Sequence, residues 1–327
     1  MSDLILSFAC ADYDRTQALA NGSVKPAGID LNYLKLPPEE VFFRMMRYEE
    51  FDMSELSASS YLIAKDRGYP KFTAIPVFPS RTFRHSAIYI HKDAGINKPE
   101  DLRGKRVGVP EYPVTALVWV RGLLQHEYGV HPSDMEWYWG GVDAPKRQGE
   151  RVSIELPANI KLEAIGSAQT LNQMLLDKQI DAIISPRAPS AFVKGSSQVI
   201  RLFSDYVSAE KNYFQKTGIF PIMHFVVIKD EILEKHPWVA MSMLQAFIRA
   251  KELNYESLGQ IGSLRVTLPW LAAELEQTKQ LMGNDFWPYG MEKNRKALET
   301  LVTYAYEQGL IKRQLKVEEL FTKSTGQ

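Results

Sequence analysis

The clearest chemical feature of this sequence is a short cluster of cationic and titratable side chains, Arg81-Thr-Phe-Arg84-His85. An arginine guanidinium is a planar fork of donors that matches both oxygens of a carboxylate. A histidine changes its charge near neutral pH and can therefore transfer a proton. We predict that Arg81 or Arg84 binds a substrate carboxylate and that His85 transfers a proton. The alternative is a solvated turn whose arginines form surface ion pairs, which contribute little.

Two further candidates for acid–base chemistry lie in more apolar surroundings. His224 precedes the apolar run Phe225–Ile228, where a histidine is more often a hydrogen-bonded core residue than a catalyst. Glu55 lies two residues before Ser57, which is placed to cap the helix that follows. In a cleft, Glu55 could accept a hydrogen bond from a ring hydroxyl, or donate a proton if desolvation raised its pKa. We therefore predict catalytic roles for Glu55 and His224 and a substrate contact for Ser57.

Anion-binding candidates also lie at the ends of predicted elements. Thr115 follows Glu111-Tyr-Pro-Val at the start of a helix predicted over Val114–Gln125. The free amides of that helix start and the Thr115 hydroxyl could bind an anion, and we predict substrate contacts for Glu111 and Thr115. The bulky Glu-Tyr-Pro run differs from the Gly/Ser-rich loops of simple anion binders. Arg187 ends a predicted strand and could bind a second carboxylate, or could be a surface arginine. Arg15 is a weaker candidate, because Asp12 and Asp14 could pair with it.

The sequence contains no recognisable motif for a metal or a nucleotide. It has neither a His-x-x-x-His pair nor a Cys-rich segment, and neither a Walker loop nor Gly-x-Gly-x-x-Gly. The prediction is therefore no cofactor and no metal site, although distant ligands could still converge on a divalent metal. The histidines are His85, His91, His126, His131, His224 and His236.

Composition excludes several classes of protein. Lys and Arg together number 39, the same as Asp and Glu, so no net field favours nucleic acid or an anionic membrane. No stretch approaches the roughly 20 apolar residues of a membrane span. Cys10 is the only cysteine, which excludes an internal disulfide and suits a reducing compartment. The N-terminus enters an apolar strand without the basic start of a secretory signal, so we expect a cytoplasmic protein.

Strand-like apolar runs alternate with helical patterns along the chain, which predicts an α/β fold. We expect a discontinuous outer lobe, residues 1–92 and 222–327, that ends in a helical C-terminal extension. An α/β lobe, residues 93–221, is expected to be inserted into it, with a ligand cleft between the two lobes. The length of 327 residues suits about two domains.

The chain also resembles known proteins. The order of its elements, with Pro99-Glu-Asp-Leu-Arg-Gly-Lys-Arg-Val-Gly-Val109, resembles the type II periplasmic-binding-protein fold. Within that fold it resembles the 4,5-dihydroxyphthalate decarboxylase family over almost its whole length. The segments that carry this closer resemblance are Phe51–Tyr61, Pro76–His85, Ser185–Pro189 and Gly218–His224.

The resemblance implies a cytosolic homo-oligomeric enzyme that removes one carboxylate from 4,5-dihydroxyphthalate and releases protocatechuate. Such a reaction needs a general acid at the ring carbon and an arginine for the remaining carboxylate, but no organic cofactor. The expected partner is thus a small aromatic acid. Two alternatives stay open: a binding protein for an anionic aromatic or sulfonate ligand, and another cytosolic enzyme on this scaffold, such as a relative of the thiamine-pyrimidine or menaquinone-pathway proteins.

Overall fold

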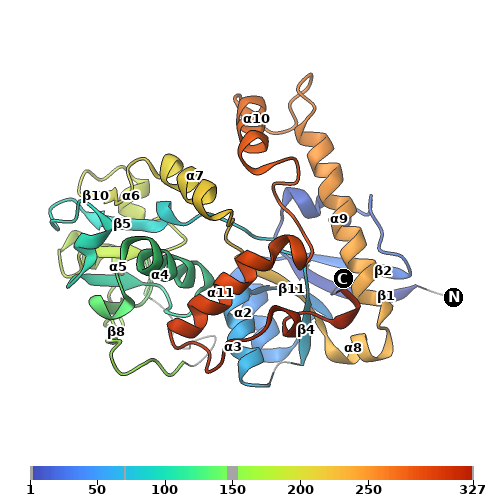
Figure 1. The fold of residues 1–327 in the computed structure, drawn as a ribbon, viewed down its shortest axis with the longest axis horizontal. Coiled ribbons are helices and arrows are strands. Elements are labelled where there is room, and N and C mark those ends of the chain that lie inside the picture. The colour runs from blue at the N-terminus through green and yellow to red at the C-terminus, as the bar shows by residue number, and fades with distance from the viewer. Residues whose placement is uncertain (1–2, 70, 146–153, 326–327) are drawn as a thin grey trace. The chain divides into compact units, whose positions relative to one another are not determined.

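The computed structural model describes residues 3–69, 71–145 and 154–325, which form two units, each built around its own sheet (Figure 1). Unit 1 consists of Met1–Arg81, His224–Glu299 and Leu315–Gln327. Unit 2 consists of Thr82–Met223 and Thr300–Gln314. Among the described residues, no helix is both long enough and apolar enough to cross a membrane.

Apart from residues 222–223, which lie in unit 2, the units differ in two places from the lobes expected from the sequence, 1–92 with 222–327 and 93–221. Residues 82–92 lie in unit 2, because the strand Ile88–His91 pairs with two strands of that unit's sheet. Residues 300–314 also lie in unit 2. Hydrogen bonding between strands and side-chain packing decide both differences, and neither leaves a clear mark in the local sequence.

The sheet of unit 1 has five strands in the order β2-β1-β3-β11-β4. Strand β1 is parallel to β2 and β3, whereas β11 is antiparallel to both of its neighbours, β3 and β4. Every residue of the central strand β3 is buried, so a charged side chain in β3 must be paired within the protein. The strands are β1 (Leu4–Cys10), β2 (Ile29–Lys35), β3 (Met53–Ser57), β4 (Phe72–Ile75) and β11 (His224–Lys229).

The helices of unit 1 follow the local signals of the sequence. Helix α2 begins with Pro38, carries Glu39 and Glu40 in its first turn, and ends before Glu49 in a left-handed conformation with φ 48°. Helix α3 begins after Ser57, whose hydroxyl accepts a hydrogen bond from the Ser60 N–H. The helices are α1 (Gln17–Ala20), α2 (Pro38–Tyr48), α3 (Ala58–Asp66), α8 (Asp230–Lys235), α9 (Trp238–Leu258) and α10 (Leu271–Met282).

Unit 2 has a mixed sheet of six strands in the order β10-β5-β9-β6-β7-β8. Its strands are β5 (Ile88–His91), β6 (Arg106–Val109), β7 (Glu136–Trp139), β8 (Leu162–Ala164), β9 (Ala182–Ile184) and β10 (Val199–Arg201). Its helices are α4 (Thr115–Tyr128), α5 (Leu171–Leu176), α6 (Ser190–Val193) and α7 (Tyr206–Thr217). The two mixed sheets, whose strands alternate with helices along the chain, confirm the predicted α/β class.

Helix α11 (Arg295–Glu307) places its second half in unit 2, against α4. The ring of Tyr304 meets Trp119 edge-to-face, with 5.5 Å between ring centroids. It also covers Gly122, where an added Cβ would lie 2.0 Å from a Tyr304 ring carbon. The buried Arg121 donates a hydrogen bond of 2.8 Å to Gln308 just beyond the helix. Glycine is thus required at position 122 because the two helices approach so closely.

We expect Gly122→Ala to lower the free energy of unfolding by about 1–3 kcal/mol, since the new methyl group must displace the Tyr304 ring. This loss would exceed the gain of up to about 1 kcal/mol from the better helix propensity of alanine. Denaturant unfolding measures the difference. Gly262→Ala is the control, because nothing lies within 4 Å of a Cβ there; equal stability of both variants would contradict the packing argument.

Candidate active site

Strand pairing in unit 1 brings a carboxylate and an imidazole together. In the antiparallel register of β3 and β11, Glu55 lies opposite Val226, and Ser57 lies opposite His224. Glu55 and His224 are therefore diagonal neighbours on one face of the sheet, within reach of long side chains. The Glu55 Oε1 and His224 Nδ1 atoms are 2.5 Å apart. We call these two residues the acid–base pair.

The Glu55 carboxylate has no solvent exposure and is held by several donors. It accepts hydrogen bonds from the Ala11 N–H at 3.1 Å, the Tyr13 hydroxyl at 2.6 Å and the Cys10 thiol at 3.5 Å. Burial by itself raises the pKa of Glu55, but the charge and hydrogen bond of His224 outweigh it, with help from Tyr13 and Ala11. The net effect lowers the pKa, so Glu55 stays ionised.

An ionised Glu55 decides which nitrogen of His224 carries a proton. Since the carboxylate can only accept, Nδ1 must donate to it, which leaves Nε2 as the nitrogen that gains or loses a proton. Nε2 has no hydrogen-bond partner in the described part of the chain, and the His224 side chain is 17% exposed. The Phe42 ring packs against the imidazole at a centroid distance of 4.8 Å. The pair is thus arranged for proton transfer at Nε2.

Arg15 lies against the tyrosine that binds the buried carboxylate. Its guanidinium carbon is 4.2 Å from the centroid of the Tyr13 ring and 4.0 Å from that of Trp287. Nε donates to the Pro79 carbonyl at 2.7 Å, and Nη1 pairs with Asp14 at 3.1 Å. The pairing with an adjacent aspartate that the sequence suggests is therefore present. Nη2 has no partner among the described residues, so it could donate to a carboxylate.

Two other predicted site residues of unit 1 are bonded to protein groups. The buried Arg81 donates through Nη1 to Asn294 Oδ1 at 2.7 Å and to the Pro288 carbonyl at 3.2 Å. Burial lowers the pKa of Arg81 to about 9. Ser57 caps α3, as the structural alternative for this residue required. Substrate contacts for Arg81 and Ser57 stay predictions.

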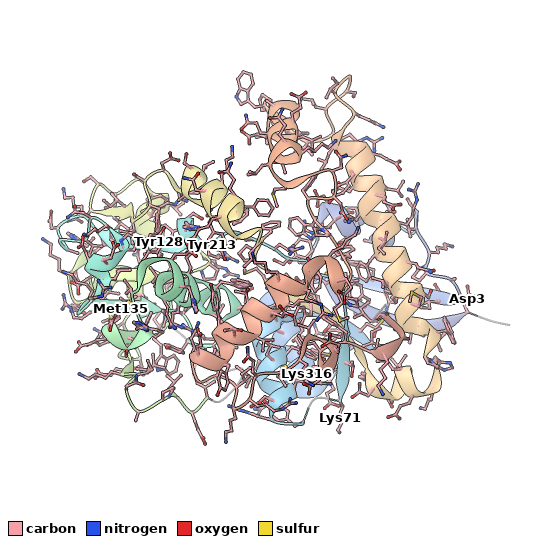
Figure 2. All side chains as sticks on the ribbon, viewed as in Figure 1. Asp3, Lys71, Tyr128, Met135, Tyr213 and Lys316 are labelled. Carbon is pink, nitrogen blue, oxygen red and sulfur yellow. The ribbon has the colours of Figure 1, made fainter. Side chains whose placement is uncertain are left out.

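His85 lies in unit 2, in an aromatic environment. Its ring contacts Phe203 and Tyr213 edge-to-face, at centroid distances of 5.2 and 5.5 Å, and Tyr128 packs on Phe203. Figure 2 labels Tyr128 and Tyr213. His85 Nδ1 is buried and has no hydrogen-bond partner in the part of the chain that is described. Burial lowers the pKa of His85 to about 4, so His85 is neutral at pH 7 and cannot donate a proton from a charged ring there.

The remaining candidates also lie in unit 2. Arg84 Nε contacts the sulfur of Met223 at 3.4 Å, and burial lowers the pKa of this arginine to about 10. Thr115 is buried at the first position of α4, and Glu111 is half-buried in the loop before it. Arg187 is exposed, and its backbone N–H bonds Ser185 Oγ at 3.2 Å. The substrate contacts predicted for these residues stay predictions.

Comparison with proteins of known function finds relatives along nearly the whole chain. Over 321 residues the chain is 41% identical to the 4,5-dihydroxyphthalate decarboxylase of Comamonas testosteroni, with 98% of this chain and 97% of the relative covered. The chain belongs to the 4,5-dihydroxyphthalate decarboxylase family. A second member of this carboxy-lyase family, from Pseudomonas putida, is 42% identical over 215 residues, which cover 66% of this chain and 83% of the relative.

Comparison with family models and with solved structures shows the wider fold. Residues 25–146 match the family model of the phosphonate ABC transporter's periplasmic substrate-binding protein. The periplasmic sulfonate-binding protein SsuA of Methylobacillus flagellatus KT aligns with a TM-score of 0.60 at 13% identity, covering 99% of this chain and 93% of that one. The type II periplasmic-binding-protein-like fold expected from the sequence is thereby confirmed for this member of the decarboxylase family.

Sequence reasoning missed two residues of the site in this family member. Neither Tyr13 nor Trp287 is among the predicted site residues, yet both lie against the Arg15 guanidinium. The available signal was the position of Tyr13 just after β1, because side chains beyond the carboxyl ends of parallel strands often form sites. For Trp287 the sequence offered no such signal. Among the residues described, no group of three or more His, Cys, Asp and Glu side chains is arranged to hold a metal ion.

We expect Glu55→Gln to reduce the free energy of unfolding at pH 7 by about 1–3 kcal/mol, because an amide can no longer accept all the hydrogen bonds that the buried carboxylate receives. The pKa of Glu55 is lowered in the folded protein, so its stabilising effect is present above the unfolded pKa of about 4.3 and is lost as the pH falls through the folded value. The variant should lack this acid-dependent loss. Denaturant unfolding between pH 3 and 7 tests both effects, with the exposed Glu163→Gln as control.

We expect His85→Phe to reduce the loss of folding stability that occurs as the pH falls from about 6.5 to 4. The folded pKa of about 4 lies below the unfolded value of about 6.5, so the unfolded chain binds a proton first as the pH falls. The wild type should therefore lose about 3 kcal/mol of stability between pH 6.5 and 4 through this residue. Melting curves across this range should show a smaller loss for His85→Phe than for the exposed control His131→Gln. An identical loss would contradict the burial argument.

Proposed function

We propose that this protein decarboxylates 4,5-dihydroxyphthalate to protocatechuate and carbon dioxide. The observation that carries the proposal is the 41% identity, over 98% of the chain, to a relative that bears this name. The acid–base pair supports it, because the reaction requires a proton donor at a ring carbon. His224 and Glu55 provide a donor whose orientation is set by a buried carboxylate.

The proposed reaction begins with electron donation from a ring hydroxyl. Each carboxylate of this substrate is para to one hydroxyl, which can push electrons towards the carbon that bears the carboxylate. His224 Nε2–H protonates that carbon and gives a dearomatised intermediate. The bond to the carboxylate then breaks, its electron pair restores the aromatic ring, and carbon dioxide leaves. Neutral His224 regains a proton from water.

Glu55 acts on the proton donor throughout this sequence. Its hydrogen bond keeps a proton on Nδ1, so only Nε2 delivers a proton. The Tyr13 hydroxyl and the Ala11 amide hold the carboxylate in place. We assign the remaining ring carboxylate to Arg15, whose guanidinium lies against Tyr13 and whose Nη2 can donate to a carboxylate oxygen.

We also propose that the enzyme works in the cytoplasm as a homo-oligomer, as expected from the family resemblance. The single, buried cysteine suits a reducing compartment. Light scattering of the purified protein and fractionation of the producing cells test these two points.

The activity is tested with metal-stripped protein and 4,5-dihydroxyphthalate, with carbon dioxide and protocatechuate followed by chromatography. In deuterium oxide, the product should carry one deuterium at the vacated ring carbon. Tight binding without product would favour a binding protein for anionic aromatic ligands. Product that forms only after a divalent metal is added would overturn the route described above.

We expect His224→Gln to lower kcat by about 10²–10⁴-fold, the usual contribution of a general acid. The variant should remain folded and show a cooperative melting transition, because glutamine can still donate a hydrogen bond to Glu55. His236→Gln serves as the control, since His236 packs against Trp238 outside the acid–base pair. Normal turnover by a folded His224→Gln variant would remove His224 from the mechanism.

A further inference from the structure

Trp287, whose indole lies against Arg15, is held by three hydrogen bonds that use all of its polar groups. Its backbone N–H donates to the Tyr255 hydroxyl at 2.8 Å, and its carbonyl accepts from Lys251 Nζ at 3.0 Å. The indole N–H donates to the Phe78 carbonyl at 2.8 Å. Bonds to both the backbone and the side chain leave the ring little freedom to turn.

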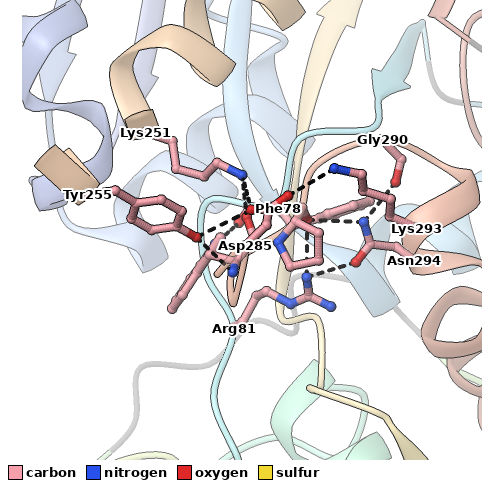
Figure 3. Close-up of polar contacts among 10 residues, drawn as sticks. Phe78, Arg81, Lys251, Tyr255, Asp285, Gly290, Lys293 and Asn294 are labelled. Atoms are coloured by element: carbon pink, nitrogen blue, oxygen red, sulfur yellow. Dashed lines mark hydrogen bonds and ion pairs between the residues drawn. The ribbon is translucent and has the colours of Figure 1, made fainter. Parts of the chain in front are cut away.

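The two side chains of α9 that bind the Trp287 backbone, Lys251 and Tyr255, both contact the Asp285 carboxylate, as Figure 3 shows. Asp285 Oδ1 lies 2.5 Å from Lys251 Nζ and 3.4 Å from the Tyr255 hydroxyl, and Oδ2 lies 3.0 Å from Lys293 Nζ. These side chains line a pocket of about 310 Å³. Lys251 is only 5% exposed, and a buried ammonium is retained only where it is paired. The network therefore ties Trp287 to a long helix.

Arg81 fixes the chain just beyond Trp287. Its Nη1 bonds the Pro288 carbonyl and Asn294 Oδ1, and Asn294 Nδ2 bonds the carbonyls of Pro288 and Gly290 at 3.0 and 2.7 Å (Figure 3). The arginine that the sequence suggested as a carboxylate clamp thus makes contacts that hold this loop.

The guanidinium carbon of Arg15 lies over both the held indole and the Tyr13 ring, 4.0 and 4.2 Å from their centroids. Stacking on aromatic rings fixes the plane of a guanidinium. A carboxylate that binds Arg15 through the edge of this plane must share its orientation. A flat aromatic acid meets this requirement and would also contact the indole.

We propose that Trp287 is a specificity-determining residue for an aromatic carboxylate bound at Arg15, and that Lys251, Tyr255 and Arg81 are positioning residues that act through it. The identity of the ligand rests on the proposed function, whereas the role of Trp287 in binding is measured separately. The acid–base pair is held by its own contacts within the sheet. Loss of the Trp287 network should therefore raise KM and leave kcat within about twofold.

The test uses phthalate, which has both carboxylates but lacks the hydroxyls that drive decarboxylation, so that calorimetry measures binding alone. Trp287→Leu and Tyr255→Phe should each weaken binding about tenfold, the change expected on loss of a partly desolvated cation–π contact. Trp287→Phe keeps an aromatic face and should restore most of the affinity. The matched controls are Trp270→Leu and Tyr69→Phe, whose side chains are exposed and which should bind as the wild type does.

The outcomes of this test separate the role of Trp287 in binding from the proposed decarboxylase activity. Unchanged affinity in folded Trp287→Leu and Tyr255→Phe would overturn the role of Trp287 while leaving the decarboxylase activity intact. If Trp287→Leu fails to fold, Tyr255→Phe alone decides, because it removes only a hydroxyl. Weaker binding in the variants of a protein that releases no carbon dioxide would support the role of Trp287 and overturn the proposed function. A wild type that does not bind phthalate would overturn the role of Trp287.

Discussion

The Glu55 carboxylate is buried at the centre of a sheet, and the arrangement of the site follows from satisfying it. An isolated carboxylate in such a position would cost several kcal/mol, so the surrounding residues must supply donors. The end of β1 supplies the Ala11 amide, the turn beyond it supplies the Tyr13 hydroxyl, and β11 supplies His224. The carboxylate that these three groups stabilise also fixes the tautomer of the histidine.

This arrangement gives a simple account of how a binding-protein fold could support proton transfer. The fold is shared with proteins such as the sulfonate-binding SsuA, and fold alone does not specify an activity. In this chain, the fold holds the titratable His224 against a buried carboxylate. A buried carboxylate that lacked any of its donors would destabilise the fold. Titratable groups held in such surroundings are found most often at functional sites.

A second set of buried charges shapes the surroundings of Arg15. Lys251 and Asp285 form a close ion pair, and Arg81 bonds to carbonyl and amide oxygens. Within the described part of the chain, these groups form hydrogen bonds to residues other than Glu55 and His224. Their common effect is on the segment that carries Trp287, and through the indole on Arg15. Buried polar networks of this kind specify one arrangement when every member is satisfied.

The sequence by itself determined the α/β class, the family resemblance and the candidate residues Glu55, His224 and Arg15. These rest on local patterns and on matching segments, which need no knowledge of contacts. Only the tertiary structure decided which candidates meet. Glu55 and His224 are 169 residues apart, and they touch because of the register of two antiparallel strands. Burial likewise decided that His85 is neutral and that Arg81 is bonded to Asn294, because the charge state and partners of a side chain depend on its surroundings rather than on its type.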